Sequence, residues 1–569
     1  MSHSKKIRVA VAQFAVGADI DANLASCLRM LDEAAICCPD IVVLPEFCNH
    51  LSWYNDKGHS WEVSAELEGA FLAAISAKAK SCGFYVVVNA TVRRTADTAT
   101  GTSILYSPSG EMLATNDKQI LIGHENDFLE RSCTEGPITE TSLGRIGMYS
   151  CMDGVINETP RSLSLRGGQL LCNSLNSFAS DEGSLHIPVR AAENKVFIAA
   201  ANKVGPLVPP EMVEPISQAT GIPVRFLNGA GESQIVAPDG TVLAIASLDK
   251  EEVVYADIDL SDADNKTRAD GTNIFENRRP ELYQDLSKDP ATQTMDAFSG
   301  SDSAQAAVIQ TASVGEAAID EAINAINALS DHVQIASLPA LFCVSDCLND
   351  LETANARSNA AIDAIAGTCG GGLLVATSLV MQVSGGYQHQ AVLIGEDGIV
   401  LTQGQVHPST RFSWSTLSDD IATYDAPFGR VALVTTDDSI YPEHFRRLAL
   451  ASVEVAAVPL MPLATWELKT GLLERSAENR INLLVASADE NLGASFITSL
   501  QKDFTVMTAW ENRPFDGLLS QPIWTQMAAD QPTLEATIYP APAVNKVVSQ
   551  RTDLLHGRPW QLVDALTKQ

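Results

Sequence analysis

The feature that most constrains this chain of 569 residues is an internal repeat. Segments of the first half recur in the same order in the second half, with small deletions between them. Three of the matching pairs are GRIGMYSCMD (144–153) with GRVALVTTDD (429–438), RAAENK (190–195) with RSAENR (475–480), and NK…RRPELY (265–283) with NK…GRPWQL (545–562). A shared order of this kind predicts two copies of one domain. We therefore expect domains at 1–286 and 304–569, joined by a small-residue, polar linker at 287–303.

Each copy alternates short strand-like runs with amphipathic helix-like runs. In the first copy, one helical stretch places Leu24, Cys27, Leu28 and Leu31 on one face. The other expected elements are strands at 6–14, 40–47 and 84–94, a helix around 63–80, and a hairpin at 103–118. Strand–helix alternation followed by hairpins favours an α/β layered domain.

Composition excludes several classes of partner. The net charge is −32, from 38 basic and 70 acidic residues, so no positive field is available to attract nucleic acid or an acidic membrane. The start of the chain lacks signal-peptide features, and no run reaches the length of a membrane span. Eleven scattered cysteines without a Cys-x-x-Cys pair favour neither disulfides nor zinc. We expect a cytoplasmic protein with a small-molecule substrate and with no metal or cofactor.

Three reactive residues of the first copy stand at predicted strand ends. Glu46 follows VVLP, Lys118 ends the hairpin, and Cys151 follows RIGMYS. Loops after the strands of α/β layers are where sites usually form. A cation such as Lys118 would lower the pKa of a cysteine thiol, and a carboxylate could accept the thiol proton. Taken one at a time, such residues are more often surface charges or small buried hydrophobes.

Together these motifs resemble those of the nitrilase superfamily of carbon–nitrogen hydrolases. The resemblance covers about residues 6–285 and rests on LPEF, on the spacing from Gly110 to Lys118, and on CMD at 151–153, with support from 190–205 and 231–244. It implies a four-layer αββα sandwich in each copy. It also implies that Cys151 is the nucleophile, Glu46 the general base and acid, and Lys118 the group that stabilises developing negative charge.

The resemblance further implies a second glutamate shortly after the lysine. Glu125 lies seven residues after Lys118 and would position the lysine or the attacking water; Glu130 and Glu135 are competitors for that role. The sequence Cys151-Met152-Asp153-Gly154 is similar to the aliphatic amidase branch, which favours hydrolysis of an amide to an acid and ammonia. An N-carbamoyl substrate is the second choice and a nitrile the third. An acyltransferase and a non-catalytic scaffold are the alternatives from other classes. Loops near 48–62, 124–135 and 174–186 would build the pocket.

The second copy has lost these groups. Alignment of the two copies puts neutral residues at all four positions: Ala340 for Glu46, Val406 for Lys118, Ser413 for Glu125 and Thr436 for Cys151. A threonine without a base or an oxyanion donor is a weak nucleophile. His407 or Asp438 could in principle act instead, but a degenerate, non-catalytic domain is the simpler interpretation. Because Asp438 matches Asp153, we expect that aspartate to have a structural role in both copies.

The family resemblance also implies how the copies associate. Its members usually pair two domains across the helices that flank the strand after the nucleophile. Here these helices are expected at 157–167 and 187–197, and at 441–452 and 468–480. A tandem chain holds both partners at high effective concentration, so we expect an intrachain pseudo-dimer. Two domains on a flexible linker are the alternative. Further homo-oligomerisation stays open.

Overall fold

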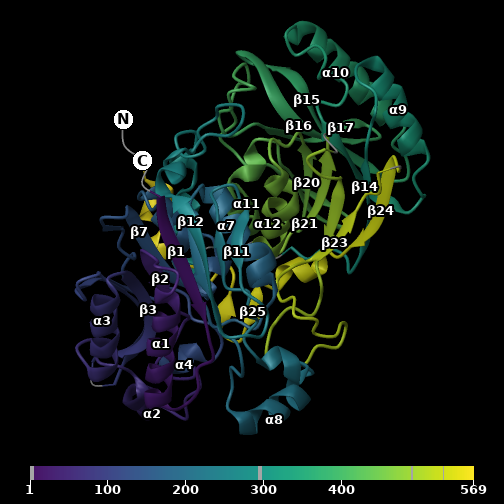
Figure 1. Ribbon diagram of the computed structural model, residues 1–569. Coiled ribbons are helices and arrows are strands. Elements are labelled where there is room, and N and C mark those ends of the chain that lie inside the picture. The colour runs from purple at the N-terminus through teal and green to yellow at the C-terminus, as the bar shows by residue number, and fades with distance from the viewer. Residues whose placement is uncertain (1–5, 96, 293–297, 489–490, 530, 569) are drawn as a thin grey trace.

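The structure is a computed structural model that describes residues 6–95, 97–292, 298–488, 491–529 and 531–568. These residues form four six-stranded sheets and one two-stranded sheet. We call 6–292 the first half and 298–568 the second half; Figure 1 shows them side by side, the first in purple to teal and the second in green to yellow. Part of the expected linker, 293–297, lies outside the described residues.

The first half contains two of the large sheets, each mixed in strand direction. The first sheet has the order β12 (Glu252–Asp259), β1 (Lys6–Gln13), β2 (Ile41–Val43), β3 (Tyr85–Arg93), β4 (Ala99–Tyr106), β5 (Met112–Asp117). The second has the order β11 (Val242–Ile245), β10 (Gln234–Val236), β9 (Phe197–Ala201), β8 (Leu170–Ser174), β7 (Arg145–Ser150), β6 (Thr139–Glu140). In each sheet the central strands run parallel and the edges are antiparallel.

The second half repeats this arrangement. Its first sheet has the order β17 (Gly398–Gly404), β16 (Gly386–Gly395), β15 (Leu374–Val383), β14 (Val333–Ala340), β13 (Ala304–Ile309), β24 (Thr533–Ile538). Its other sheet has the order β18 (Thr423–Ala426), β19 (Gly429–Leu433), β20 (Val455–Leu460), β21 (Asn482–Ser487), β22 (Phe496–Ser499), β23 (Ile523–Gln526). The small sheet pairs β25 (Val547–Ser549) with β26 (Thr552–Asp553).

Helices cover the outer faces of the paired sheets and also occur in the connections between elements. Those of the first half are α1 (Ile20–Ala35), α2 (Lys57–Val63), α3 (Ala70–Cys82), α4 (Glu125–Phe128), α5 (Met152–Val155), α6 (Glu158–Leu165), α7 (Ile187–Asn194) and α8 (Pro210–Thr220). Those of the second half are α9 (Glu316–Asn327), α10 (Leu351–Ala366), α11 (Pro442–Leu450), α12 (Leu472–Asn479) and α13 (Asp564–Thr567). Each half is a four-layer αββα sandwich, as the sequence predicts.

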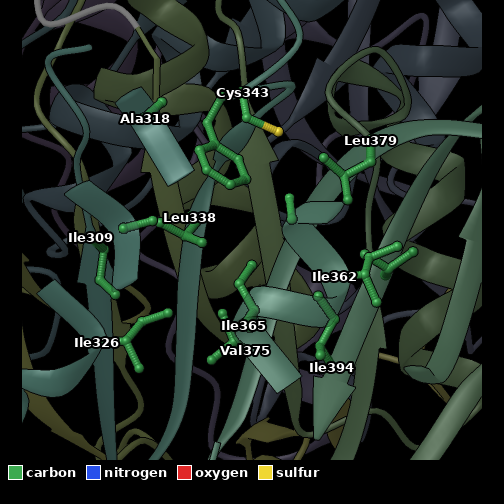
Figure 2. Close-up of a cluster of buried hydrophobic side chains, with 14 of the residues drawn as sticks. Ile309, Ala318, Ile326, Leu338, Cys343, Ile362, Ile365, Val375, Leu379 and Ile394 are labelled. Carbon is green, nitrogen blue, oxygen red and sulfur yellow. The ribbon is translucent and has the colours of Figure 1, made fainter. Parts of the chain in front are cut away.

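The layers follow from the two-residue period of the strands. In β1, Ala10 and Ala12 face the helices α1 and α3, whereas Val9 and Val11 face the partner sheet. Both faces are therefore apolar, as buried parallel strands require. Burying one valine side chain stabilises the fold by roughly 1.5–3 kcal/mol. Figure 2 shows the matching layer of the second half, where Ile309, Leu338 and Val375 from strands meet helix residues.

One expected element is wrong in its bounds. The helix predicted around 63–80 begins only at Ala70, because the preceding residues form a separate connection. Ala65 makes a bridge with Val92 of β3, and its N–H and C=O are both used by that strand. The backbone groups of this connection are thus satisfied by the sheet and are not available to a helix.

Reciprocal ion pairs join the helices of the two halves. Arg161 Nε of α6 lies 2.9 Å from Glu443 Oε1 of α11, and Arg446 Nε of α11 lies 3.1 Å from Glu158 Oε1 of α6. The same exchange occurs between α7 and α12, where Arg190 contacts Glu478 and Arg475 contacts Glu193. In every case, residues equivalent in the repeat exchange partners. Such an exchange is the signature of an isologous, two-fold-like interface.

The tail of each half also lies on the other half. Arg278 Nε contacts Glu443 Oε1 at 2.9 Å, and Arg558 Nη1 contacts Glu158 Oε1 at 3.3 Å. In Figure 1 the C-terminal segment, in yellow, returns from the second half to the first, where β25 is labelled. Within the described residues, no helix is both long enough and apolar enough to cross a membrane.

Candidate active site

The fold brings the four candidate residues of the first half together. Glu46 follows β2, Lys118 follows β5, Cys151 follows β7, and Glu125 opens α4. All four side chains are buried. Lys118 Nζ lies 2.9 Å from Glu46 Oε1 and 2.9 Å from Glu125 Oε2, so the lysine connects the two carboxylates.

The two glutamates keep Lys118 positively charged. Burial alone would lower the pKa of the lysine, but the charges of Glu125 and Glu46 raise it well above its usual value. Glu125 is fixed from a second side, because its Oε2 also accepts a hydrogen bond from the Ile122 N–H at 3.1 Å. Its competitors lie elsewhere: Glu130 is exposed, and Glu135 contacts Arg166 at 3.4 Å.

Glu46 has the properties of a general base that works near neutral pH. Burial raises its pKa to about 7, and the neighbouring Lys118 opposes that rise. Oε1 of Glu46 is paired with Lys118, whereas Oε2 has no hydrogen-bond partner among the described residues. Oε2 is therefore free to take a proton. A base with a pKa near the working pH transfers protons most effectively.

Cys151 occupies a strained turn between β7 and α5. Its φ is 49° and its ψ is −112°, a conformation that costs a non-glycine residue about 1–3 kcal/mol. Two acceptors hold its N–H, Asn173 Oδ1 at 3.1 Å and the Ser174 carbonyl at 3.0 Å. Burial, and then the charge of Glu46, raise the pKa of the thiol well above its usual value, while Lys118 lowers it. This environment favours the neutral thiol, which would need a base before it could act as a nucleophile.

Asp153 ties this turn to the lysine strand. Its Oδ1 accepts hydrogen bonds from the backbone N–H groups of Gln119 at 3.1 Å and Ile120 at 2.8 Å, directly after Lys118. In the second half, Asp438 accepts in the same way from Val406 at 3.0 Å and His407 at 2.9 Å. The aspartate therefore makes the same structural contact in both halves.

These contacts correct two of the expected equivalences. Since Asp438 binds the N–H groups of 406 and 407, the residue at the position of Lys118 is Gln405, not Val406. The strand contacts agree, because the N–H of Lys118 donates to Gly101 and that of Gln405 to His389. The reason is the hairpin turn: Leu105 pairs with Ala114 in β4–β5, but Leu393 pairs with Leu401 in β16–β17, a span shorter by one residue.

The expected equivalent of Glu125 is also wrong by one residue. Thr552 accepts a hydrogen bond from the Gly123 N–H at 3.1 Å, and its equivalent Thr272 accepts one from the Thr410 N–H at 2.9 Å. Glu125 therefore corresponds to Phe412, not Ser413. Phe412 is buried in the apolar core of the second half. The second site thus has Ala340, Gln405, Phe412 and Thr436 where the first has Glu46, Lys118, Glu125 and Cys151.

Thr436 is held by backbone groups of its own half. Its hydroxyl donates to the Met461 carbonyl at 3.1 Å and accepts from the Met461 N–H at 2.8 Å. Next to it, Asp437 forms ion pairs with Arg411 and with Arg268 from the first half, both at 2.6 Å. His407 is likewise engaged, by Asp438 at 2.7 Å and by Tyr283 at 2.5 Å. Each of these side chains is thus engaged by neighbouring groups of the protein.

A cavity of about 410 Å³ adjoins the first site. All three loops expected to build a pocket contribute to it, with Trp53, Glu125 and Asn176 as examples. Four further lining residues come from the second half and were not anticipated: Val506, Met507, Ser549 and Gln550. No local pattern in the sequence could identify them, because only the association of the halves brings them to the first site.

Lys203 is a second buried lysine that the sequence analysis did not single out. It follows β9, and its Nζ has no hydrogen-bond partner among the described residues. Burial lowers its pKa to about 8, while Cys48, Glu46 and Cys151 raise it. The signal was available, since Lys203 closely follows the apolar run VFIAAA (196–201).

The described residues contain no cluster of three or more side chains that could bind a metal ion. The arrangement can supply a nucleophile, a base and a fixed positive charge from side chains alone. Within it, a carbonyl carbon could be attacked by sulfur while its oxygen faces an ammonium group.

Comparison with known proteins gives a consistent class. The family model for carbon–nitrogen hydrolases matches residues 8–267. The chain is 26% identical to a nitrilase of Pyrococcus abyssi over 264 residues, 46% of this chain and 93% of that protein. It is 28% identical to the ω-amidase NIT2 of Danio rerio over 267 residues, 45% and 89% of the two chains. A solved structure of a nitrilase-superfamily amidase from Nesterenkonia AN1 covers 50% of this chain and 98% of its own, at 21% identity and a TM-score of 0.41.

The chain is therefore an enzyme of the class that hydrolyses carbon–nitrogen bonds. Its first half matches the carbon–nitrogen hydrolase family model and is similar to members of the nitrilase superfamily.

Proposed function

We propose that the first half hydrolyses a small amide to a carboxylic acid and ammonia through an acyl-enzyme on Cys151. The observation that carries this proposal is the buried Glu46–Lys118–Glu125 ion cluster beside a cysteine in a strained turn. Strained backbone at a buried, charged centre is typical of reactive sites. The ω-amidases among the relatives support an amide as substrate.

In the first step, Glu46 accepts the thiol proton while sulfur bonds to the amide carbon. The carbonyl π electrons move to oxygen, and the Lys118 ammonium group stabilises that negative charge. Collapse of this intermediate breaks the C–N bond, and Glu46 returns the proton to the leaving ammonia. Water then gives a proton to Glu46 and attacks the thioester carbon. Sulfur leaves and takes back a proton, which regenerates the thiol. Glu125 positions Lys118 throughout.

We further propose that domain 1–286 and domain 304–569 have different functions. The second is non-catalytic and acts as an intrachain pseudo-dimer partner for the first. The reciprocal ion pairs of α6 and α7 with α11 and α12 support this assignment. The eleven free cysteines support a reduced, cytoplasmic setting.

A substrate screen with a covalent-adduct measurement tests the proposed chemistry. Purified protein is incubated with primary amides, N-carbamoyl amino acids and nitriles, and released ammonia is measured. We expect ammonia mainly from amides. With a slowly hydrolysed amide, mass spectrometry should detect the acyl group on the peptide that contains Cys151. An adduct on Cys48 instead, or ammonia from nitriles alone, would contradict the proposal.

A further inference from the structure

Both halves of the chain contribute residues to the wall of the cavity beside Glu125. One apolar cluster includes Met152, next to the nucleophile, together with Val506 and Val548 from the second half. Met507 packs against the same cluster and lines the cavity. The second half therefore contributes apolar surface directly to the space in which a substrate of the first site would lie.

This wall is fixed to the loop that carries Glu125. The Val506 N–H donates to the Val548 carbonyl at 2.8 Å, which joins the wall to β25. Thr552 of β26 donates to the Leu121 carbonyl at 3.0 Å and accepts from the Gly123 N–H at 3.1 Å. Because the same hairpin holds both the wall and the Glu125 loop, their relative position is set by the second half.

The charge of the lining restricts what can bind. Its ionised residues are the carboxylates Glu125 and Asp127, and no lysine or arginine is among the described residues that line it. The Arg551 guanidinium is already paired with Asp127. His124 Nε2 is engaged by the Ser52 carbonyl at 2.7 Å. A substrate carboxylate in this cavity would lose its hydration without gaining a free cation, because Lys118 and Arg551 are already paired with the carboxylates of the lining.

The remaining lining favours apolar groups. Trp53, Phe128 and Phe178 contribute aromatic faces, and Val506 and Met507 contribute aliphatic ones. A cavity of about 410 Å³ lies within the usual range for sites that enclose a small organic ligand, roughly 300–1,000 Å³. Tyr54 connects this surface to the catalytic centre: burial raises the pKa of its hydroxyl, and so do the charges of Glu125 and Glu46.

We propose that the second half completes the acyl-group subsite of the first, and that this subsite selects neutral amides with an apolar acyl chain over amides that carry a carboxylate. This inference rests on the amide hydrolysis proposed above and specifies its substrate class. Met507 is the specificity-determining residue supplied by the second half. Its flexible thioether can adapt to chains of different length.

The test measures kcat/KM for straight-chain amides from acetamide to hexanamide, and for succinamate, which carries a carboxylate. Each added methylene should raise kcat/KM about three- to fourfold until the cavity is full. Hexanamide should therefore exceed both acetamide and succinamate at least tenfold. A preference for succinamate would overturn the inference while leaving amide hydrolysis intact. Absence of ammonia from every amide would overturn both.

Two variants isolate the role of the second half. Met507→Ala should lower the ratio of kcat/KM for hexanamide to that for acetamide at least fivefold. Met507→Gln, nearly equal in volume and only half-buried, should lower it similarly without loss of folding. The matched control is Ile523→Ala, an exposed site in the same half that does not line the cavity, which should leave the ratio unchanged. An unchanged ratio in a folded Met507→Gln protein would overturn the inference.

Discussion

The two halves preserve the same backbone and differ in their charges. Positive φ occurs at equivalent positions in both, at Phe47 and Leu341 and again at Lys195 and Arg480. Cys151 also has positive φ, but Thr436 is not among the described residues that do. The second half has therefore relaxed the one turn whose strain the proposed chemistry requires. Positive φ at shared turns belongs to the fold, and its presence at Cys151 but not at Thr436 supports the proposed role of Cys151.

The buried charges are likewise shared at the interface and different at the two sites. At the interface, both halves keep an arginine and a glutamate at equivalent places on their helices, so these buried charges have opposite partners. At the sites, the carboxylates and the lysine occur in the first half only. A buried charge is costly unless it is paired or used. The second half thus retains the charges that hold the halves together and lacks those used by the proposed chemistry.

The largest expected effect is a difference in kcat between alanine variants at Cys151 and at its equivalent, Thr436. Cys151→Ala should reduce kcat by about 10⁴-fold or more, because the covalent step is lost. Thr436→Ala should change kcat less than twofold, since neither Gln405 nor Phe412 can activate a hydroxyl. Steady-state ammonia release from both proteins measures the contrast. A tenfold loss in Thr436→Ala, with unfolding unchanged, would mean that the second site takes part in turnover.

The next effect concerns the interface. Arg190→Met leaves Glu474 and Glu478 buried without one of their cations, and removing one member of such a buried pair costs about 3–5 kcal/mol. Urea unfolding followed by circular dichroism measures the change. The control is Arg29→Met, whose ion pairs with Glu33 and Glu251 are exposed and should contribute below about 1 kcal/mol. Equal losses in the two variants would contradict a coupled interface.

The fold was predictable because it depends on patterns that are local or repeated. Strand–helix alternation predicted layered α/β domains and the repeat predicted two copies, whereas the four-layer sandwich was implied by the family resemblance. The charged helices at 158–165 and 472–479 lie within the ranges expected for the contact between halves. The bounds of the helix around 63–80 were wrong because Ala65 pairs with β3, a contact formed by residues distant in sequence.

The site was only partly predictable. Motif spacing located Glu46, Lys118, Cys151 and Glu125, which the fold brings together. The alignment of the two copies was wrong by one residue after the hairpin of the second copy. Matching short sequence segments does not detect a turn that is one residue shorter when both turns contain glycine. The contribution of Met507 to the cavity wall could not be predicted from the sequence, since it depends on how two distant parts of the chain pack. Lys203 could have been noticed from its position after a strand.

The pH dependence of activity should reflect the first half alone. Glu46, with a pKa of about 7, is protonated at lower pH and then cannot accept the thiol proton. We expect kcat/KM to fall about tenfold per pH unit below pH 7 and to level off above it. Glu46→Gln should have a low and flat profile in this range. A wild-type profile that stays flat down to pH 5 would remove Glu46 from the role of base.

The smallest expected effect comes from restoring the nucleophile alone. Thr436→Cys, made in the Cys151→Ala background, should leave ammonia release at the background level of Cys151→Ala. The new thiol would stand in a turn without positive φ, with Gln405 and Phe412 in place of Lys118 and Glu125 and with no carboxylate at Ala340. A thiol without a base stays protonated, and an oxyanion without a cation is poorly stabilised. Mass spectrometry with the slow amide should find no acyl group on the peptide containing residue 436. Turnover above that background would mean that the second half still holds a usable site and that its loss is confined to one side chain.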